Sequence, residues 1–461
     1  MSHARTDLPS SHLDWSAYAP SAFGGLFGDP FGTPDPTPVD GFRAAAGACN
    51  GRQACLSKDP GTVMCPSFRA TGDPTHATEH RARTVQAALA GQYGDQPFAS
   101  EAVIHALSWC LGCKACKREC PQAVDLAALA VEARARRWQA RGGAPLAVRL
   151  LADAPRLVGR LGPLARLREM LPGGRWLVQR LFGIDARRAL PRAARRPFFQ
   201  DLPAVLGPES GHDVVLLVDD HTALFEPAVA RAALDVLLAA GCRVFLPRSA
   251  DGRHGLASGK PALSAGLVIQ ARREAAVLLE TLAPHLDAGR PIIGLEPSFH
   301  LMLRDDLQML GLGEGAPRLA RHALLLEEYL ARESAAGRLH LPLRRGPWRQ
   351  VVVHGHCHQK AFGLMPALQA TLGLIPGLTV EVIDAGCCGM AGAFGLQADN
   401  YAVSMAIAEE ALLPAVRAAD PATGVVANGM SCRQQIRHGS TRLGLHVAQV
   451  LQAALDPGET A

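Results

Sequence analysis

Residues 109–121 read WCLGCKACKRECP, and this stretch decides how the N-terminal part of the chain folds. Its cysteines follow the spacing C-x2-C-x2-C-x3-C-P, the bacterial ferredoxin pattern that holds a [4Fe–4S] cluster. Zinc ribbons usually carry two Cys-x-x-Cys pairs separated by a long spacer, and cysteines of an apolar core have no reason to follow this register. The spacing therefore predicts an iron–sulfur protein.

A second cysteine motif lies upstream, with Cys49 and Cys55 followed by Cys65-Pro66. In two-cluster ferredoxins, the cysteine before proline in each motif serves the cluster of the other motif. This rule predicts that one [4Fe–4S] cluster is held by Cys65, Cys110, Cys113 and Cys116.

The cysteines that remain for a second cluster are Cys49, Cys55 and Cys120, one thiolate short of a cube. This centre is either a [3Fe–4S] cluster or a cube with a non-cysteine ligand, for which His76 and His80 are near in sequence. The third alternative is that the second cluster does not form.

The chain has 461 residues, of which 48% are hydrophobic and 19% charged, and a formal net charge of +5. These values are typical of a globular chain of about three domains. We find no apolar segment behind a basic start, and no apolar run of the ~18 residues that span a bilayer. Twelve cysteines in such a chain favour thiolates in a reducing compartment, so we expect a cytoplasmic protein.

The helical segments between the cysteine motifs, followed by alternating strand-like and helical segments, predict an α+β multidomain chain. Proline, glycine and serine are frequent near the N-terminus, which is typical of an extension with little fold of its own. We expect a flexible extension at 1–40, an α-helical ferredoxin-like domain at 41–140, a basic helical linker at 141–205, and two α/β domains at 206–340 and 345–455.

The segment from Glu132 to Arg196 carries sixteen arginines and four acidic residues. Charge runs usually lie on solvated faces, so we favour solvated helices that link two domains. The alternative is a docking face for an acidic partner or for an anionic membrane, with peripheral association at its inner face. Nucleic acid is not an expected partner, because no recognised binding motif accompanies the charge.

From about residue 206, apolar runs typical of buried strands alternate with helical segments, and the pattern occurs twice. The first copy contains the runs Val214–Val218, Arg243–Leu246 and Pro291–Leu295. The second copy contains the runs Val351–Val353, Leu378–Ile383 and Gly424–Ala427. This alternation predicts two open and largely parallel sheets.

In the second copy a cysteine follows each strand, in the sequences HGHCH, AGCCG and NGMSC. Because ligands bind outside the carboxyl ends of parallel strands, we expect these cysteines to converge at one edge of the sheet. Four unrelated core thiols would not account for this placement. The pattern predicts a metal or redox site made of Cys357, Cys387, Cys388 and Cys432.

The first copy has no such set of thiols. Its matching strand ends carry Asp219, Ser258 and Phe299, and Cys242 stands before a strand, as a core residue does. We expect this copy to have kept the fold and lost the site.

These motifs resemble a known family. Cys49–Cys55, Gly61–Phe68 and the run at 109–121 are similar to the iron–sulfur part of FAD-linked 2-hydroxyacid dehydrogenases, including the D-2-hydroxyglutarate and D-lactate types. Gly355–His358 and Gly386–Gly395 resemble the cysteine-rich CCG domain. That domain also occurs in the glycolate oxidase iron–sulfur subunit, the anaerobic glycerol-3-phosphate dehydrogenase small subunit and heterodisulfide reductase. The resemblance covers roughly residues 42–450 and implies two tandem CCG domains, the first of them degenerate.

The resemblance implies an electron-transfer subunit of an oxidoreductase. The sequence contains no flavin domain, so FAD is expected on a partner flavoprotein that oxidises a 2-hydroxy acid. A cluster would then pass single electrons from that flavin to a quinone or a soluble carrier.

The resemblance leaves two alternatives for the CCG cysteines, a further iron–sulfur centre or a zinc ion. His356 and His358 are candidates for ligands or for donors to a ligand. The competing function is that of a heterodisulfide reductase, with redox chemistry at the CCG cysteines themselves. The third possible function is that of a non-catalytic, zinc-stabilised scaffold, which the ferredoxin-type cysteine run disfavours.

Overall fold

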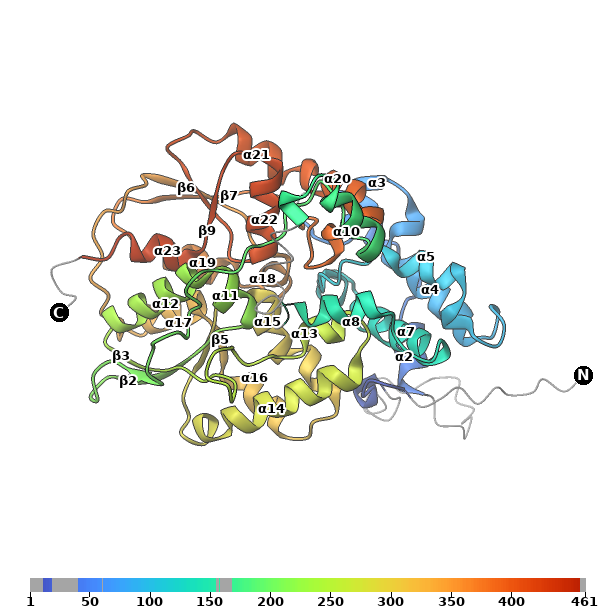
Figure 1. The fold of residues 1–461 in the computed structure, drawn as a ribbon, viewed down its shortest axis with the longest axis horizontal. Helices are drawn as coiled ribbons and strands as arrows, with labels where there is room; N and C mark the ends of the chain where they lie inside the picture. Colours follow the sequence, from blue (N-terminus) through green and yellow to red (C-terminus); the bar gives the residue numbers. More distant parts are fainter. Residues whose placement is uncertain (1–10, 19–39, 60, 155–156, 158–167, 457–461) are drawn as a thin grey trace, which may run out of the picture.

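The computed structural model describes residues 11–18, 40–59, 61–154, 157 and 168–456. Within these residues the chain is an α+β protein, as the pattern of motifs and apolar runs predicts. Figure 1 shows helices of the N-terminal part, in blue to cyan, on one side of the molecule and two sheet-containing parts on the other.

The N-terminal part is helical, as expected for residues 41–140. Its α-helices are α2 (Gly41–Gly47), α3 (Pro66–Thr71), α4 (Thr78–Leu89), α5 (Glu101–Ser108), α6 (Ala115–Glu119) and α7 (Leu126–Ala140), and its short 3-10 turns include η2 (Ala54–Leu56), η3 (Pro74–His76) and η4 (Pro97–Ala99). Polar side chains cap the helix starts: the Asp125 carboxylate accepts the Ala128 N–H at 3.1 Å, and Ser100 caps α5 in the same way. Phe42, Val85 and Leu129 are fully buried and form the centre of this part.

Residues 11–18 pack against α7, although they belong to the stretch 1–40 that we expected to have little fold. Leu13 and Trp15 are buried. The buried carboxylate of Glu132 accepts the N–H groups of His12 and Leu13 at 3.0 and 2.9 Å. The buried side chains of Leu13 and Trp15 and the Glu132 carboxylate thus hold residues 11–18 against α7. Residues 1–10 and 19–39 of the stretch lie outside the described residues.

The first sheet has the strand order β1-β3-β2-β4-β5, and its strands are parallel except for β1. The strands are β1 (Val205–Leu206), β2 (His212–Leu217), β3 (Cys242–Phe245), β4 (Ile292–Gly294) and β5 (Ala323–Leu325). Its helices are α11 (Asp220–Phe225), α12 (Pro227–Ala239), α13 (Lys260–Ser264), α14 (Val268–Asp287), α15 (Pro297–Leu301), α16 (Gly315–His322) and α17 (Leu326–Ala335), with the 3-10 turns η5 (Met302–Arg304) and η6 (Asp306–Leu310).

The second sheet is parallel throughout and has the order β7-β6-β8-β9. The strands are β6 (Gln350–Val353), β7 (Thr379–Val382), β8 (Gly424–Val426) and β9 (Gly444–Leu445). Its helices are α18 (Cys357–Ala361), α19 (Met365–Leu372), α20 (Tyr401–Glu410), α21 (Leu412–Ala418), α22 (Met430–Gly439) and α23 (Val447–Gln452). The order β3-β2-β4-β5 of the first sheet recurs here, so the repeated pattern in the sequence is confirmed as a repeated topology.

The two sheet-containing parts share a core. Helix α12 packs on α23, as Figure 1 shows, and α17 packs on α19. Val214 and Leu216 of the first sheet belong to the same buried cluster as Val351 and Val353 of the second. Because residues of both sheets lie in one buried cluster, the strand ends of the second sheet are held in a fixed position relative to the first sheet-containing part.

The basic segment is not simply solvated, which corrects the expectation from its charge. It contains α8 (Leu146–Ala152) and α10 (Gly174–Phe182), while 155–156 and 158–167 lie outside the described residues. Arg188 is 1% exposed and donates to the Gly395 carbonyl, the Gln435 amide and the Ser404 hydroxyl at 2.7–2.8 Å. A buried guanidinium that donates to three acceptors helps to hold the surrounding segments together. The number of charged residues in the sequence alone does not predict such a role.

Candidate metal centres

The ferredoxin-type cysteines lie on a loop that turns sharply between α5 and α6. Gly112 and Lys114 both adopt left-handed backbone conformations, with φ of 64° and 63°. Cys110 and Cys113 stand in the loop, Cys116 lies in the first turn of α6, and Cys120 directly follows that helix.

One cavity is lined by Cys65, Cys110, Cys113 and Cys116. Cys65 comes from the residue before α3, more than forty positions upstream, and directly precedes Pro66. These are the four cysteines that the cross-wiring rule assigns to one cluster. The structure brings them together, and their role as ligands remains a prediction.

Burial raises the pKa of two of the thiols around this cavity, Cys113 and Cys116. For Cys113 burial is the main cause, followed by the nearby charges of Cys357 and Cys116, and burial also raises the pKa of Cys116. Buried thiols become thiolates when a cation compensates their charge. The donor set therefore suits a bound metal cluster.

Arg81 contributes a buried positive charge to the wall of the same cavity. Its guanidinium donates to the Cys65 sulfur at 3.4 Å, to the Ser67 hydroxyl at 2.9 Å and to the Ala106 carbonyl at 2.9 Å. Among the residues that the structure describes, no carboxylate forms an ion pair with Arg81. Buried charges are normally paired, so this guanidinium fits an anionic group in the cavity.

Lys114 anchors the cysteine loop to the first sheet-containing part. Its ammonium, 2% exposed, lies 3.1 Å from Asp125, 3.1 Å from Asp305 and 2.5 Å from Asp306. Burial alone would lower the pKa of Lys114, but these three carboxylates raise it well above its usual range. The loop is thus held by charge between elements far apart in the sequence.

The second predicted ferredoxin centre would consist of Cys49, Cys55 and Cys120. Burial raises the pKa of Cys55, and the Cys55 sulfur accepts the Glu79 N–H at 3.3 Å. Cys120 is half-buried at the end of α6. The set Cys49, Cys55 and Cys120 therefore stays a prediction.

The two histidines considered as non-cysteine ligands differ in their surroundings. The His76 ring lies 4.3 Å from the Trp109 ring, and its Nδ1 is 3.0 Å from the Thr71 hydroxyl. Burial lowers the pKa of His76, whereas His80 is exposed. His76 remains the better candidate.

The four CCG cysteines converge at the carboxyl edge of the second sheet. Cys357 hydrogen-bonds with Cys387, Cys387 with Cys388, and Cys388 with Cys432, and all four are buried. The hydrogen bond from Cys387 lowers the pKa of Cys357, and those from Cys387 and Cys432 lower that of Cys388. The structure thus places these cysteines at the strand ends, and their role as a metal or redox site remains a prediction.

His356 and His358 lie on either side of the Cys357 thiol. The Cys357 sulfur is 4.0 Å from His356 Nδ1 and 3.6 Å from His358 Nδ1. Burial disfavours the charged form of His356, but the Cys357 thiolate raises its pKa to about 9. Cys357 and His356 therefore resemble a thiolate–imidazolium pair, the arrangement that activates a cysteine.

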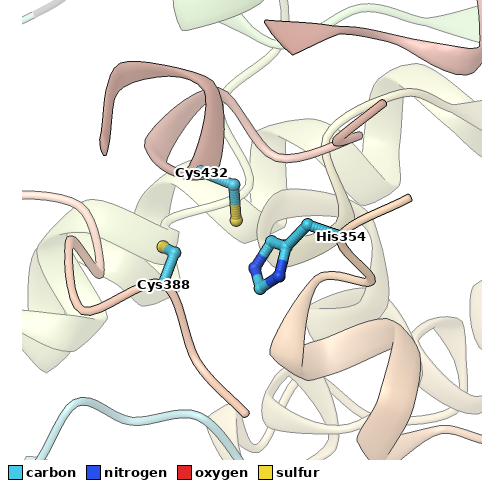
Figure 2. Close-up of side chains that lie close together, drawn as sticks. All are labelled: His354, Cys388 and Cys432. Carbon is cyan, nitrogen blue, oxygen red and sulfur yellow. The ribbon is translucent and has the colours of Figure 1, made fainter. Parts of the chain in front are cut away.

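His354 also belongs to this edge and was missed as a candidate from the sequence. Figure 2 shows its ring directed at the sulfurs of Cys388 and Cys432. The donor atoms of these three side chains lie within 4.8 Å of one another. The signal was present in the sequence HGHCH, whose first histidine directly follows the strand.

The two groups of cysteines are neighbours in space. Helix α18, which begins at Cys357, packs against α6 of the ferredoxin-type loop. The charge of Cys357 acts on Cys113, and Arg118 of α6 lies 4.5 Å from the Phe362 ring. The CCG site is therefore placed next to the predicted cluster site.

The first copy lacks thiols at its strand ends, as expected. Cys242 is buried with its sulfur 3.5 Å from the Tyr329 hydroxyl, which confirms it as a core residue. Glu296, which the sequence did not single out, accepts the Met430 N–H at 2.8 Å and so supports the helix that carries Cys432. The first α/β copy thus helps to position the cysteine site of the second α/β copy.

Comparison with known proteins gives relatives but no family model that matches. The chain is 27% identical to D-2-hydroxyglutarate dehydrogenase of Pseudomonas putida, over 87% of this chain and 42% of that protein. It is 25% identical to D-2-hydroxyglutarate dehydrogenase of Escherichia coli, over 88% of this chain and 43% of that protein. It is also 27% identical to one subunit of the anaerobic glycerol-3-phosphate dehydrogenase of Escherichia coli, over 64% of this chain and 72% of that protein.

The chain spans less than half the length of the D-2-hydroxyglutarate dehydrogenases that it matches. These relatives are dehydrogenases and a dehydrogenase subunit, which supports the expectation of an oxidoreductase component. The suspected resemblance is confirmed: this chain is similar to D-2-hydroxyglutarate dehydrogenases and to a glycerol-3-phosphate dehydrogenase subunit.

Proposed function

We propose that this chain is an iron–sulfur electron-transfer component of a 2-hydroxyacid dehydrogenase system. The observation that carries the proposal is the cavity lined by Cys65, Cys110, Cys113 and Cys116, with the buried cation of Arg81 in its wall. These four thiolates would hold a [4Fe–4S] cluster, which supplies one-electron transfer when bound. The domain division at 41–140, 206–340 and 345–455, with two CCG-type domains, belongs to the same proposal.

The flavin that gathers two electrons from a lactate-, glycolate- or 2-hydroxyglutarate-like substrate would sit on a partner flavoprotein. The acceptor would be a quinone or a soluble carrier. The CCG cysteines, next to Cys113, would form a second metal or redox centre.

Anaerobic purification of the tagged chain from its native cells tests this function. We expect iron and sulfide in cluster stoichiometry and a flavoprotein that co-purifies with FAD. Purified chain without iron and sulfide would contradict the proposal.

A second function is favoured by one observation, the pair of Cys357 and His356. A cysteine of lowered pKa beside a histidine of raised pKa is suited to thiol–disulfide chemistry, as in a heterodisulfide reductase. An assay of the purified chain for disulfide reduction separates the two functions. The first copy has no thiols at its strand ends, which disfavours the second function.

Replacing Arg81 by glutamine should lower the reduction potential of the cluster. The guanidinium donates a charged hydrogen bond to the Cys65 sulfur, which stabilises the more negative reduced state. We expect a fall of about 60 mV, the equivalent of tenfold in a one-electron equilibrium. A redox titration monitored by electron paramagnetic resonance measures it. The potential of Arg81→Lys, which keeps the charge, should fall less, and equal potentials in all three proteins would refute the role.

Helix α10 exposes apolar side chains that are suited to an anionic membrane surface. Trp176 and Leu181 are each 62% exposed, and Arg175 and Arg180 are exposed on the same helix. Aromatic and aliphatic side chains combined with arginine are typical of helices that lie in the membrane interface. No helix of the described ranges is long and apolar enough to cross a bilayer.

We expect the chain to sediment with phosphatidylglycerol vesicles and the double variant Trp176→Ser, Leu181→Ser to lose most of this binding. Val277→Ser, at an exposed apolar position of α14, is the matched control and should bind like the wild type. Loss of the co-purifying flavoprotein in the double variant, with vesicle binding unchanged, would assign α10 to the partner instead.

A further inference from the structure

Glu327 is a buried carboxyl group of the first α/β copy that contacts the second copy. It lies in the first turn of α17 and is 0% exposed. Its Oε1 accepts a hydrogen bond from the Asn428 side-chain amide at 3.0 Å and another from the Gln359 side-chain amide. Gln359 lies on α18, after β6, and Asn428 follows β8. One carboxyl oxygen thus joins the two segments that carry Cys357 and Cys432.

The Gln359 amide connects Glu327 to the Cys357 side of the CCG site. Gln359 is two residues after Cys357 on the same short helix, and it is buried. Its Oε1 accepts the His356 N–H at 3.0 Å while its Nε2 donates to Glu327. A change in the charge of Glu327 therefore acts, through one buried amide, on the backbone beside Cys357.

The Asn428 amide connects Glu327 to the Cys432 side of the same site. Asn428 is buried, and its Oδ1 accepts the Val447 N–H at 3.0 Å. Gly429 follows it directly, and a Cβ atom placed on this glycine would lie 3.3 Å from the Cys432 sulfur. The backbone that Asn428 holds in place therefore passes close to the Cys432 thiol.

The surroundings of Glu327 favour its protonated form. Within the described part of the chain, no lysine, arginine or histidine forms an ion pair with it, and its Oε2 has no hydrogen-bond partner. A buried carboxylate without a cation is costly, so such a group binds a proton more readily than an exposed one. Burial raises the pKa of Glu327 to about 7, the hydrogen bond from its own N–H lowers it, and the charge of Glu328 adds to the rise.

The other titratable groups around Glu327 differ from it in their pairing or their chemistry. Glu328, next to it on α17, forms an ion pair with Arg304. The elements β4, β5 and α19, which pack against α17, carry no titratable side chain. The titratable and charged groups at 356–360 and 428–433 are His356, Cys357, His358, Lys360, Cys432 and Arg433. Glu327 is therefore the one carboxyl among these groups that lacks a cation.

We propose that Glu327 binds one proton when the CCG site gains one electron, and releases this proton when the electron leaves. The electron comes from the reduced iron–sulfur cluster of the proposed function, and the proton comes from water and binds to a carboxylate oxygen. Added negative charge disfavours a nearby buried carboxylate, because the local dielectric constant is low. Glu327 acts through Gln359 and Asn428, which makes it a positioning residue. The inference deepens the redox role proposed above for the CCG cysteines, and it rests on that role.

The pH dependence of the reduction potential of the CCG site tests the proposal in the purified full-length chain. Below about pH 7, Glu327 is protonated in both redox states, so we expect a constant potential. Above this pH it binds a proton only on reduction, so the equilibrium constant of reduction should fall tenfold per pH unit, which is about 59 mV. Glu327→Gln keeps an acceptor for both amides but cannot bind the proton, so its potential should not change over the same range.

Glu226→Gln is the matched control. Glu226 also holds the segment of Cys432, but through an ion pair with Arg433, and its side chain is 24% exposed. This variant should keep the pH dependence of the wild type. Infrared difference spectra between the oxidised and the dithionite-reduced wild type give a readout that needs no variant. Above pH 7 we expect the C=O band of a protonated carboxyl group to appear on reduction.

A wild-type potential that is independent of pH, the same pH dependence in Glu327→Gln, or the absence of the infrared band would overturn the inference. A chain whose only redox group is the ferredoxin-type cluster would also overturn it, and would leave the proposed electron-transfer function in place. A chain without iron and sulfide, whose CCG site has a potential with a pH dependence that Glu327→Gln reduces, would support the inference and contradict that function.

Discussion

Replacing Cys113 by serine should abolish most of the visible absorption of the iron–sulfur cluster and block electron transfer to the acceptor. Cys113 lines the cavity together with Cys65, Cys110 and Cys116, and a hydroxyl is a much poorer ligand for iron than a thiolate. We expect acceptor turnover by the reconstituted complex to fall at least about a hundredfold, equivalent to about 2.7 kcal/mol in the barrier.

Reduction of the flavin by substrate separates this effect from general damage. Because substrate would be met on the partner flavoprotein, flavin reduction in the complex with Cys113→Ser should keep its wild-type rate. Cys242→Ser removes a buried thiol that has no part in the site, and it should retain both the cluster and turnover. Full acceptor turnover in Cys113→Ser would exclude the proposed electron path.

Replacing Lys114 by methionine should lower the free energy of unfolding by about 3–5 kcal/mol. The Lys114 ammonium is 2% exposed and lies among the carboxylates of Asp125, Asp305 and Asp306, which would be left with too little positive charge. Removing one partner of a buried ion network costs more than the network contributes, because the remaining charges stay buried. Urea unfolding of the cluster-loaded chain, followed by circular dichroism, measures the change.

Lys117→Met is the matched control, since Lys117 pairs with Asp125 and Asp305 but is 23% exposed. Water can compensate much of its loss, so we expect a smaller effect, about 1 kcal/mol. If the two variants were equally stable, burial of Lys114 would not be what makes its charge important.

The cysteine motifs and the repeated strand–helix pattern could be predicted from the sequence, because each depends on residues that are close together along the chain. The spacing of Cys110, Cys113 and Cys116 fits one turn of chain around a cluster, and this spacing is set by residues that are close together in the sequence. The strand ends of the second sheet follow from apolar runs of strand length. Since parallel strands share one edge, the meeting of Cys357, Cys388 and Cys432 was predictable in the same way.

The surroundings of the charged residues were predicted less well from the sequence than those of the cysteines. Arginines at 132–196 suggested a solvated linker, yet Arg188 is fully buried among carbonyl, amide and hydroxyl acceptors of the second part. The acceptors lie about two hundred positions away, and no local pattern announces them. Residues 11–18 were likewise expected to have little fold, but they pack against α7, because the carboxylate of Glu132 on that distant helix accepts their N–H groups.

The sequence by itself determined that this chain carries a ferredoxin-type cysteine loop and two α/β repeats, of which the second bears the thiols. Only the tertiary structure decided that the Arg81 charge lies against Cys65, that Lys114 joins the loop to Asp305, and that His354 completes the group at Cys388. Periodicity and spacing are properties of neighbouring residues along the chain. Burial and pairing are properties of residues that meet only when distant segments pack, so they had to be observed.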